Sequence, residues 1–215
     1  MIVLSFNCRG LASQAKRLAL KELVRAHNPD IIMLQETLGK GEEVISVLSK
    51  LMPRWSFFAL DAVGRSGGVV SGFNPVKLKY VSSWGSQNVL AVELFSSELN
   101  LSLLSLNIYG PCLERERFWS AFFRSSWIAH PFLIIGGDLN FSLGEAESWG
   151  ATAKSDPLSE FFLNRIALAH LVDMPLLKLK PTWRNRRVGQ EWVGKKLDRF
   201  PLSEPLMELL SEYRH

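Results

Sequence analysis

The segment Leu133-Ile134-Ile135-Gly136-Gly137-Asp138-Leu139-Asn140 constrains the fold of this chain more than any other. An apolar run ends there in a carboxylate and a carboxamide placed two residues apart. The run is typical of a buried strand, and residues i and i+2 of an extended strand project from the same face. We therefore expect Asp138 and Asn140 to project together from a sheet, a pairing that suits phosphate-ester chemistry. A turn is the alternative interpretation, because Gly, Asp and Asn are turn formers.

The length of 215 residues allows one large domain or two small ones, and the composition is that of a globular protein. No Gly/Ser/Pro-rich linker divides the chain, so we predict a single domain over residues 1–215. The apolar runs are strand-sized, which argues against a membrane-spanning segment. Two cysteines do not make a disulfide scaffold, and the N-terminus resembles a strand more than a signal peptide. We expect an intracellular protein, nuclear or cytoplasmic.

Apolar periodicity predicts strands and helices along the whole chain. The predicted strands are Ile2–Phe6, Ile31–Leu34, Gly68–Gly72, Val89–Leu94, Leu101–Ile108, Phe132–Ile135 and Leu197–Leu202, and the predicted helices are Ala15–His27, Glu42–Leu51, Glu114–Ile128 and Asp156–Leu171. Residues 66–108 contain consecutive strands, which favours antiparallel hairpins. The predicted fold class is α/β: a four-layered sandwich of two mixed, mostly antiparallel sheets flanked by helices.

The net charge of +4 is concentrated near the C-terminus. The basic residues of this segment are Lys178, Lys180, Arg184, Arg186, Arg187, Lys195, Lys196 and Arg199, with Trp183 and Trp192 among them. Cations interleaved with flat aromatic rings suit a phosphate backbone and its bases. We expect this segment to contact nucleic acid; a solvated basic loop is the alternative.

Polar residues also follow several of the predicted strands. They are Asn7, Glu36, Asn107, Tyr109, Asp138, Asn140 and Asp198. Taken singly, each could be a turn residue or an exposed strand end. A sheet assembles a site from distant parts of the sequence in this way, so the set as a whole predicts a functional site.

These positions lie in an ordered series of motifs. The motifs are Leu4-Ser5-Phe6-Asn7-Cys8-Arg9-Gly10, Leu34-Gln35-Glu36-Thr37, Ser66-Gly67-Gly68, Asn107-Ile108-Tyr109-Gly110-Pro111, Arg117-Phe118-Trp119, Gly136-Gly137-Asp138-Leu139-Asn140-Phe141, Pro181-Thr182-Trp183 and Lys196-Leu197-Asp198-Arg199-Phe200. The series resembles the endonuclease/exonuclease/phosphatase superfamily, which has the deoxyribonuclease-like fold. More narrowly, it is similar to the endonuclease domain of plant LINE-type (non-LTR) retrotransposons.

The resemblance implies a Mg²⁺-dependent DNA endonuclease, with Mn²⁺ as a substitute metal. Glu36 would be the principal metal ligand, with Asn7 beside it, since Mg²⁺ takes few protein carboxylates and keeps several waters. In the same scheme Asp138 would activate the attacking water, Asn140 would bind a phosphate oxygen, and Tyr109 would stabilise the phosphate or the leaving oxygen. We expect Asn107, Trp183, Arg184 and Lys196 to contact the DNA substrate.

The chain departs from the family pattern near its end. Asp198 would orient a catalytic histidine from a Ser-Asp-His motif, but neither that motif nor the last core strand occurs in this sequence. His27, His130 and His170 fit structural roles, and His215 is a poor substitute. We therefore expect a truncated domain with weak or no nuclease activity, lower stability, and an exposed sheet edge near the first strand that could support self-association.

Two other functions remain open on the sequence alone. The chain could be a non-catalytic nucleic-acid-binding remnant, which the missing histidine favours. It could also be a phosphatase of the same superfamily, because such enzymes share most of these residues and fold alone does not separate them.

Overall fold

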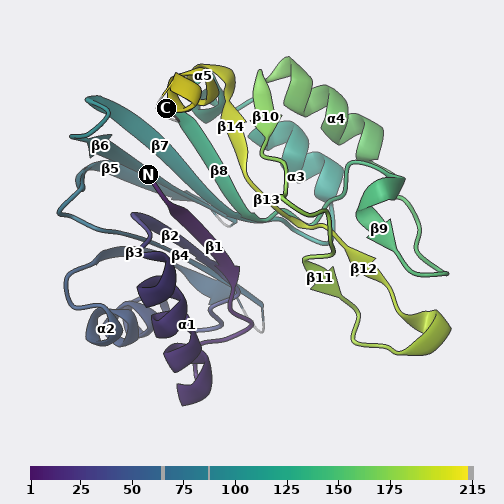
Figure 1. Cartoon of the computed structure of the whole chain (residues 1–215), viewed down its shortest axis with the longest axis horizontal. Helices are drawn as coiled ribbons and strands as arrows, with labels where there is room; N and C mark the ends of the chain where they lie inside the picture. The colour runs from purple at the N-terminus through teal and green to yellow at the C-terminus, as the bar shows by residue number, and fades with distance from the viewer. Residues whose placement is uncertain (64–65, 87, 213–215) are drawn as a thin grey trace. The chain divides into compact units, whose positions relative to one another are not determined.

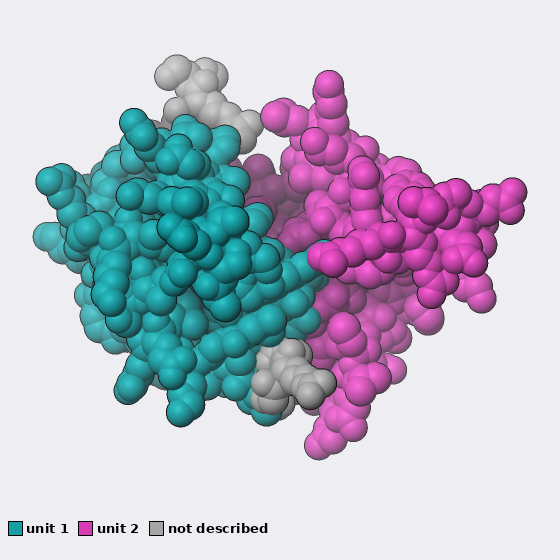
Figure 2. All heavy atoms as spheres, turned by 90° about the horizontal axis from the view of Figure 1, so that it is seen from below, with its two compact units in different colours: residues 1–109, 136–138 teal, residues 110–135, 139–215 magenta. Residues whose placement is uncertain are grey.

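The computed structural model describes residues 1–63, 66–86 and 88–212, and the chain divides into two compact units (Figures 1 and 2). Unit 1 comprises residues 1–109 and 136–138, and unit 2 comprises residues 110–135 and 139–215. Strand β8 (Leu133–Asp138) contributes its first half to unit 2 and its last three residues to unit 1. Neither unit is therefore a continuous stretch of sequence, and the single domain expected from the sequence stays a prediction.

Unit 1 begins with two strands joined by a helix and continues, after a second helix, as a run of strands (Figure 1). Its elements are β1 (Val3–Asn7), α1 (Gln14–His27), β2 (Ile31–Gln35), α2 (Gly41–Leu51), β3 (Ser56–Val63), β4 (Ser66–Phe73), β5 (Leu78–Ser86), β6 (Val89–Ser96) and β7 (Leu101–Tyr109). The predicted helices Ala15–His27 and Glu42–Leu51 match α1 and α2 closely. β3 and β5 were not among the predicted strands.

A mixed four-stranded sheet with the order β1-β2-β4-β3 forms the centre of unit 1. β1 and β2 are parallel, whereas β4 is antiparallel to both β2 and β3. Ile32 and Leu34 of β2 pack with Leu20 of α1 and Leu48 of α2. On the other side, β2 and β4 lie against β6 and β7. All five residues of β2 are buried because both faces of the strand are covered, which explains the apolar run Ile31–Leu34 before the buried Gln35.

The second sheet of unit 1 is a meander in which β5 pairs with β6 and β6 with β7, both antiparallel. This arrangement confirms the hairpins expected over residues 66–108. The predicted fold class is also confirmed: the chain is α/β, with mixed sheets flanked by five α-helices in the described part. β1 lies at one end of its sheet, where the sequence predicts an exposed edge. Self-association through that edge stays a prediction.

Unit 2 combines helices with short strands. Its elements are α3 (Arg115–Phe122), the first half of β8, β9 (Ser148–Trp149), α4 (Ser159–Leu168), β10 (Leu171–Asp173), β11 (Trp183–Arg184), β12 (Gly194–Lys195), β13 (Asp198–Arg199), β14 (Pro201–Ser203) and α5 (Glu204–Glu212). β14 pairs with β10 and β8, and a separate small sheet has the order β11-β12-β9. The single strand predicted over Leu197–Leu202 is wrong: β13 and β14 are separate, with Phe200 between them.

Aromatic rings form the core between α3 and α4 of unit 2. Trp119 of α3 is 1% exposed and meets both Phe141 and Phe162 edge to face, and the rings of Phe141 and Phe162 stack at 3.8 Å between centroids. Such aromatic pairs add stability beyond the area that they bury. The periodic aromatic residues of the 114–128 region therefore serve the core, although α3 itself ends at Phe122.

Asp156 does not begin α4, contrary to the sequence prediction. The helix begins at Ser159, and the buried Asp156 carboxylate instead accepts hydrogen bonds from both terminal nitrogens of Arg115 and from the N–H groups of Ser142 and Leu158. Burial alone would raise the pKa of Asp156, but these hydrogen bonds and the charge of Arg115 outweigh burial and lower it. Asp156 thus links three separate segments of unit 2 as an anion.

Four charged side chains form a second buried network in unit 2. Arg199, which is 1% exposed, and Lys196, which is 4% exposed, each contact both Asp173 and Glu147. Arg199 also donates from Nε to the Phe141 carbonyl and lies over the Phe141 ring. Two cations and two carboxylates balance one another, as buried charges require. The network fixes the segment 196–199 against the loop that follows β8.

No helix in the described ranges is both long and apolar enough to cross a lipid bilayer.

The buried network predicts a large difference between two arginines. Arg199→Met would leave Asp173 and Glu147 short of a buried cation, so we expect a loss of about 3–5 kcal/mol in the free energy of unfolding. Arg187→Met is the matched control, because the Arg187–Glu191 pair is exposed and should contribute less than about 1 kcal/mol. Urea unfolding of the three proteins measures both values; equal, small losses would show that the network does not stabilise unit 2.

The lowered pKa of Asp156 predicts a pH-dependent effect of Asp156→Asn. Because the pKa is lower in the folded than in the unfolded state, the ionised carboxylate stabilises the fold above about pH 4, and this contribution disappears as the pH falls through the folded-state pKa. We expect Asp156→Asn to destabilise the protein at pH 7 and the difference from wild type to shrink below pH 4. Urea unfolding across this range, with the exposed Glu160→Gln as control, tests it; a pH-independent difference would contradict it.

Candidate active site

The Asn7 side chain lies between two carboxylates of unit 1 and donates a hydrogen bond to each. The three residues stand at the ends of three different strands. Its Nδ2 donates to Glu36 Oε1 at 2.7 Å and to Asp138 Oδ2 at 2.9 Å. Asn7 is the last residue of β1, Glu36 follows β2, and Asp138 is the last residue of β8. The three residues predicted to form the metal and water-activating site therefore meet in one small cluster.

The parallel pairing of β1 and β2 places Asn7 beside Glu36. Asn7 is opposite Gln35 in the register, and the pairing continues beyond the strands because Cys8 N–H donates to the Gln35 carbonyl and Gly10 N–H to the Glu36 carbonyl. Asn7 Oδ1 accepts from Arg9 N–H, which fixes the plane of its amide. Glu36 has a φ of 50°, a left-handed conformation that is unfavourable for Glu and is held by these neighbours.

The glycine pair Gly67-Gly68 supports the turn that carries Glu36. The carbonyls of Gly68 and Gly67 accept from the N–H groups of Thr37 and Leu38. Gly68 has a φ of +80°, and a Cβ at this position would lie 2.4 Å from Thr37 Oγ1. Only glycine satisfies both conditions. The turn that carries Glu36 therefore explains the glycines of the Ser66-Gly67-Gly68 motif.

Gly137 similarly allows the ends of β7 and β8 to lie close together. It has a φ of +138°, and a Cβ there would lie 2.0 Å from the Ile108 carbonyl oxygen. Tyr109, the residue after Ile108, is half-buried, and its backbone pairs with Asn88 through two hydrogen bonds. The strand ends that carry Tyr109 and Asp138 are thus neighbours in unit 1.

The Asn107 side chain is buried and hydrogen-bonded to other residues of unit 1. Its side chain is 0% exposed; Oδ1 accepts from Gln35 Nε2 at 2.7 Å, and Nδ2 donates to the Val70 carbonyl at 2.8 Å. These bonds join β7 to β2 and β4 across the two sheets of unit 1. The substrate contact expected for Asn107 is not favoured by this placement, since both ends of the amide are used in the core.

Asn140 lies in unit 2, and the argument that paired it with Asp138 does not hold. β8 ends at Asp138, and Asn140 has a φ of 54°, so the alternation of an extended strand does not extend to it. Asn140 Nδ2 donates to the Gly110 carbonyl at 2.5 Å. A Cβ on Gly110 would lie 2.1 Å from the Leu139 carbonyl oxygen, which explains the glycine in the Asn107–Pro111 motif.

The motifs around Thr182 and Asp198 meet in unit 2. The Thr182 hydroxyl accepts from the N–H groups of both Leu197 and Asp198, at 3.0 and 3.1 Å. Leu139 N–H donates to the Leu197 carbonyl, so the segment containing Asn140 is bound to the segment containing Asp198. Lys196, expected to contact substrate, belongs instead to the buried network with Asp173 and Glu147, which leaves its ammonium group little access to a DNA phosphate.

The remaining predicted substrate residues are accessible. Arg184 is exposed, Trp183 is half-buried, and the Arg184 guanidinium lies 5.8 Å from the centre of the Trp192 ring. A cavity of about 520 Å³ in unit 2 is lined by Cys112, Arg115, Asn140, Asp156, Pro157, Trp183, Asn185, Val193, Lys195 and Leu197. Asn140 and Trp183 therefore share one cavity, as a substrate-binding role would require.

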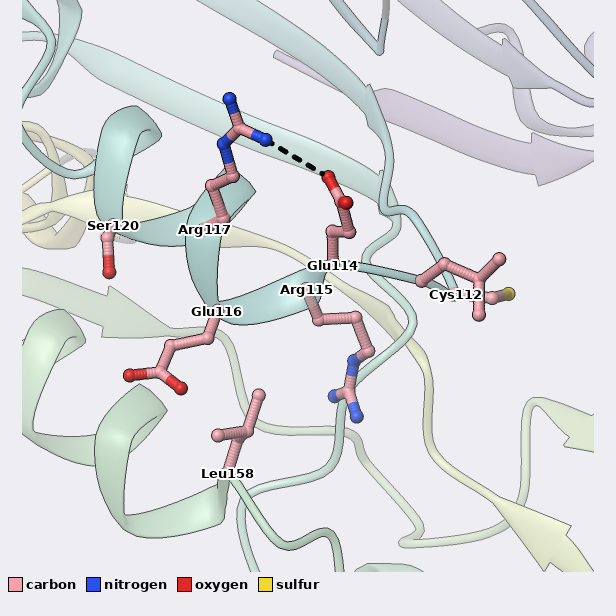
Figure 3. A pocket seen from close by; sticks show the side chains of 8 residues that line it. Cys112, Glu114, Arg115, Glu116, Arg117, Ser120 and Leu158 are labelled. Carbon is pink, nitrogen blue, oxygen red and sulfur yellow. Dashed lines mark hydrogen bonds and ion pairs between the residues drawn. The ribbon is translucent and has the colours of Figure 1, made fainter.

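A larger surface pocket of unit 2 contains none of the predicted site residues. Its volume is about 710 Å³, and charged side chains at the start of α3 line it, including the ion pair of Arg117 with Glu114 (Figure 3). Both members of that pair are exposed. Size alone is thus a poor guide to the functional site in this protein.

The described histidines have local roles. His27 lies in the last turn of α1, where a positive charge is favourable. His130 Nδ1 accepts from Phe132 N–H, and His170 Nδ1 lies 3.2 Å from Glu204. His215 lies outside the described residues.

The two carboxylates of the Asn7 cluster are oxygen donors of the kind that Mg²⁺ prefers. Within the described ranges, no group of three or more His, Cys, Asp or Glu residues could hold a metal. Two carboxylates are the sparse oxygen set that Mg²⁺ uses, with water completing its shell. Burial raises the pKa of the Cys8 thiol to about 12, so this thiol is protonated at neutral pH.

A search among curated proteins found no match. Solved structures with similar folds include the endonuclease domain of TRAS1, a telomere-specific non-LTR retrotransposon, with a TM-score of 0.71 and 16% identity over 96% of this chain and 86% of that chain. The AP endonuclease LMAP from Leishmania major has a TM-score of 0.71 and 17% identity over 96% and 80%. The 3′ phosphatase NExo from Neisseria has a TM-score of 0.74 and 15% identity over 95% and 87%.

At these identities the similarity establishes the fold alone. The sequence model of the Endonuclease/Exonuclease/phosphatase family, however, matches residues 4–200, which is most of the chain and includes every predicted site residue. This chain belongs to the endonuclease/exonuclease/phosphatase family.

Proposed function

We propose that this protein is a Mg²⁺-dependent phosphodiesterase that nicks DNA, of the type that non-LTR retrotransposons use. The observation that carries the proposal is the convergence of Glu36 and Asp138 on the Asn7 amide. Two carboxylates from distant parts of the sequence would repel each other without a donor or a cation between them. The Asn7 amide supplies such a donor, but it is neutral and leaves both negative charges in place, so the convergence suits a divalent cation beside them.

The residues of the cluster divide the chemistry between them. Glu36 would hold Mg²⁺, or Mn²⁺ in its place, with Asn7 as its neighbour. A divalent metal at this position stabilises the extra negative charge that develops on the phosphate during hydrolysis. Asp138 accepts a proton from the attacking water or orients it, while the Asn7 donor keeps its carboxylate in place. Tyr109, at a neighbouring strand end of unit 1, would donate to the phosphate or to the leaving oxygen. Asn140 belongs to unit 2 and not to this cluster, and its proposed role, binding a non-bridging phosphate oxygen, is a separate assignment.

DNA is the proposed substrate because of the basic, aromatic segment of unit 2. Arg184, Arg186 and Arg187 are exposed near Trp183 and Trp192, a combination that suits a phosphate backbone with stacked bases. Two structures with similar folds were determined with DNA: NExo with a product hairpin and D. rerio TDP2 with a single-stranded product. The retrotransposon type is supported by the sequence motifs and by the TRAS1 endonuclease fold.

We propose further that the turnover of this chain is slow. The printed sequence contains no Ser-Asp-His motif to supply the histidine that the family pattern places with Asp198, and His27, His130 and His170 have other local roles. Loss of a positioned acid or base typically costs a factor of 10² to 10⁴ in rate. The same observation favours a non-catalytic DNA-binding module as the second candidate function. A phosphatase is the third, supported by the fold that the chain shares with NExo.

Plasmid nicking with Glu36→Gln tests the enzymatic proposal. We expect wild-type protein to nick supercoiled DNA slowly with Mg²⁺ and not with EDTA, and Glu36→Gln to lower the rate by about 10²–10³ because the principal metal-binding carboxylate is lost. Glu22→Gln, an exposed acid of α1, is the matched control and should retain the wild-type rate.

The alternatives give different results in the same assay. DNA binding without Mg²⁺-dependent nicking would support the non-catalytic module. Release of phosphate from a 3′-phosphorylated oligonucleotide, without nicking, would support the phosphatase. Nicking that Glu36→Gln leaves unchanged would contradict the proposed site.

A further inference from the structure

A cavity of about 430 Å³ lies in unit 1 beside the Asn7 cluster, at the start of α1 and α2. Its lining residues are Arg9, Gly10, Leu11, Ala12, Ser13, Lys16, Arg17, Thr37, Leu38, Gly39, Glu43, Val44 and Val47. Arg9 follows Asn7 by two positions and Thr37 directly follows Glu36, so the cavity adjoins the candidate active site. None of the predicted catalytic, metal or substrate residues lines it.

The cavity carries positive charge that the described residues do not neutralise. The guanidinium groups of Arg9 and Arg17 have no hydrogen bond or ion pair within the described ranges, whereas the Lys16 ammonium is occupied by the carbonyls of Cys8 and Arg9. Glu43 is the one acidic residue of the lining, and the first turn of α1 contains no acid. Two unpaired guanidiniums provide bidentate donors of the kind that bind phosphate.

The rest of the lining is apolar and partly accessible. Leu11 and Val44 are buried, Val47 is half-buried, and Leu38 is 45% exposed. Leu38 has a φ of 56° and is held there by the hydrogen bond from its N–H to the Gly67 carbonyl. An exposed leucine fixed in an unfavourable backbone conformation, at the rim of an apolar wall, offers a surface against which a flat ring can pack.

We propose that this cavity binds a nucleotide, with its phosphate on Arg9 and Arg17 and its base against Leu38, Val44 and Val47. The cationic half of the lining matches a phosphate, and the apolar half matches a flat base. The volume of the cavity lies in the range of small-molecule sites. The ligand is a free mononucleotide or one nucleotide of a DNA strand. Only the DNA source rests on the proposed function; the nucleotide chemistry rests on the cavity itself.

Calorimetric titration in EDTA tests the cavity without any metal-dependent activity. The probes are dTMP, thymidine, inorganic phosphate and a short oligo(dT). We expect saturable binding of dTMP that is stronger than binding of thymidine or phosphate, and that weakens with added salt. Arg17→Ala should weaken dTMP at least about tenfold by removing charge-assisted hydrogen bonds.

Two further variants refine the test. One separates the apolar half of the cavity from its cationic half, and the other separates binding in the cavity from a general effect of surface charge. Val47→Phe should fill the apolar part, weakening dTMP binding but not phosphate binding. Lys21→Ala removes an exposed cation of α1 outside the cavity and should leave dTMP binding unchanged. Thermal melts confirm that each variant is folded. Competition between oligo(dT) and dTMP would assign the cavity to a DNA strand, and its absence would assign it to a free nucleotide.

No saturable dTMP binding to the wild-type protein would overturn the inference. An equal loss in Arg17→Ala and Lys21→Ala would overturn it too, because it would indicate general surface charge. The proposed function fails separately: Glu36→Gln affects nicking but should leave dTMP binding in EDTA intact.

Discussion

The Asn7 amide is the interaction on which the organisation of unit 1 depends. One nitrogen donates to carboxylates from two other strand ends, and the oxygen of the same amide accepts from the Arg9 backbone. Glutamate, aspartate or an aliphatic side chain at this position could not make all three bonds. The left-handed Glu36, the glycine pair that supports it and the close approach at Gly137 all serve to bring the two acids to this amide.

Much of unit 1 could be predicted from the sequence. The first four residues of β2 are all apolar because both faces of the strand are covered, and the helical periodicity of residues 15–27 and 42–51 is regular. The grouping of Asn7, Glu36 and Asp138 followed from their positions at the ends of strands. β3 was harder to predict, because its residues Ser56–Val63 are mostly half-buried and alternate weakly between apolar and polar.

The failures have a common physical cause: a polar residue type does not reveal whether its partners are protein atoms or ligand. Asn107 was grouped with the substrate residues, but it satisfies Gln35 and the Val70 carbonyl between two sheets. Lys196 was counted with the basic surface, but its charge balances Asp173 and Glu147. The partners of Asn107 and Lys196 are residues far away in the sequence, such as Asp173. No local motif indicates that these residues pair with Asn107 or Lys196. At Asn140, strand alternation predicts an extended residue, but β8 ends at Asp138 and Asn140 adopts a left-handed conformation.

The different surroundings of the two cysteines have a practical consequence. Cys8 is 4% exposed and, with a pKa near 12, contains almost no thiolate at neutral pH, whereas Cys112 is exposed at the rim of the unit 2 cavity that contains Asn140 and Trp183. A maleimide dye added to the unmodified protein should therefore attach at Cys112. A change in the fluorescence of the attached dye would then indicate ligand binding in that cavity. No cysteine would have to be introduced by mutation.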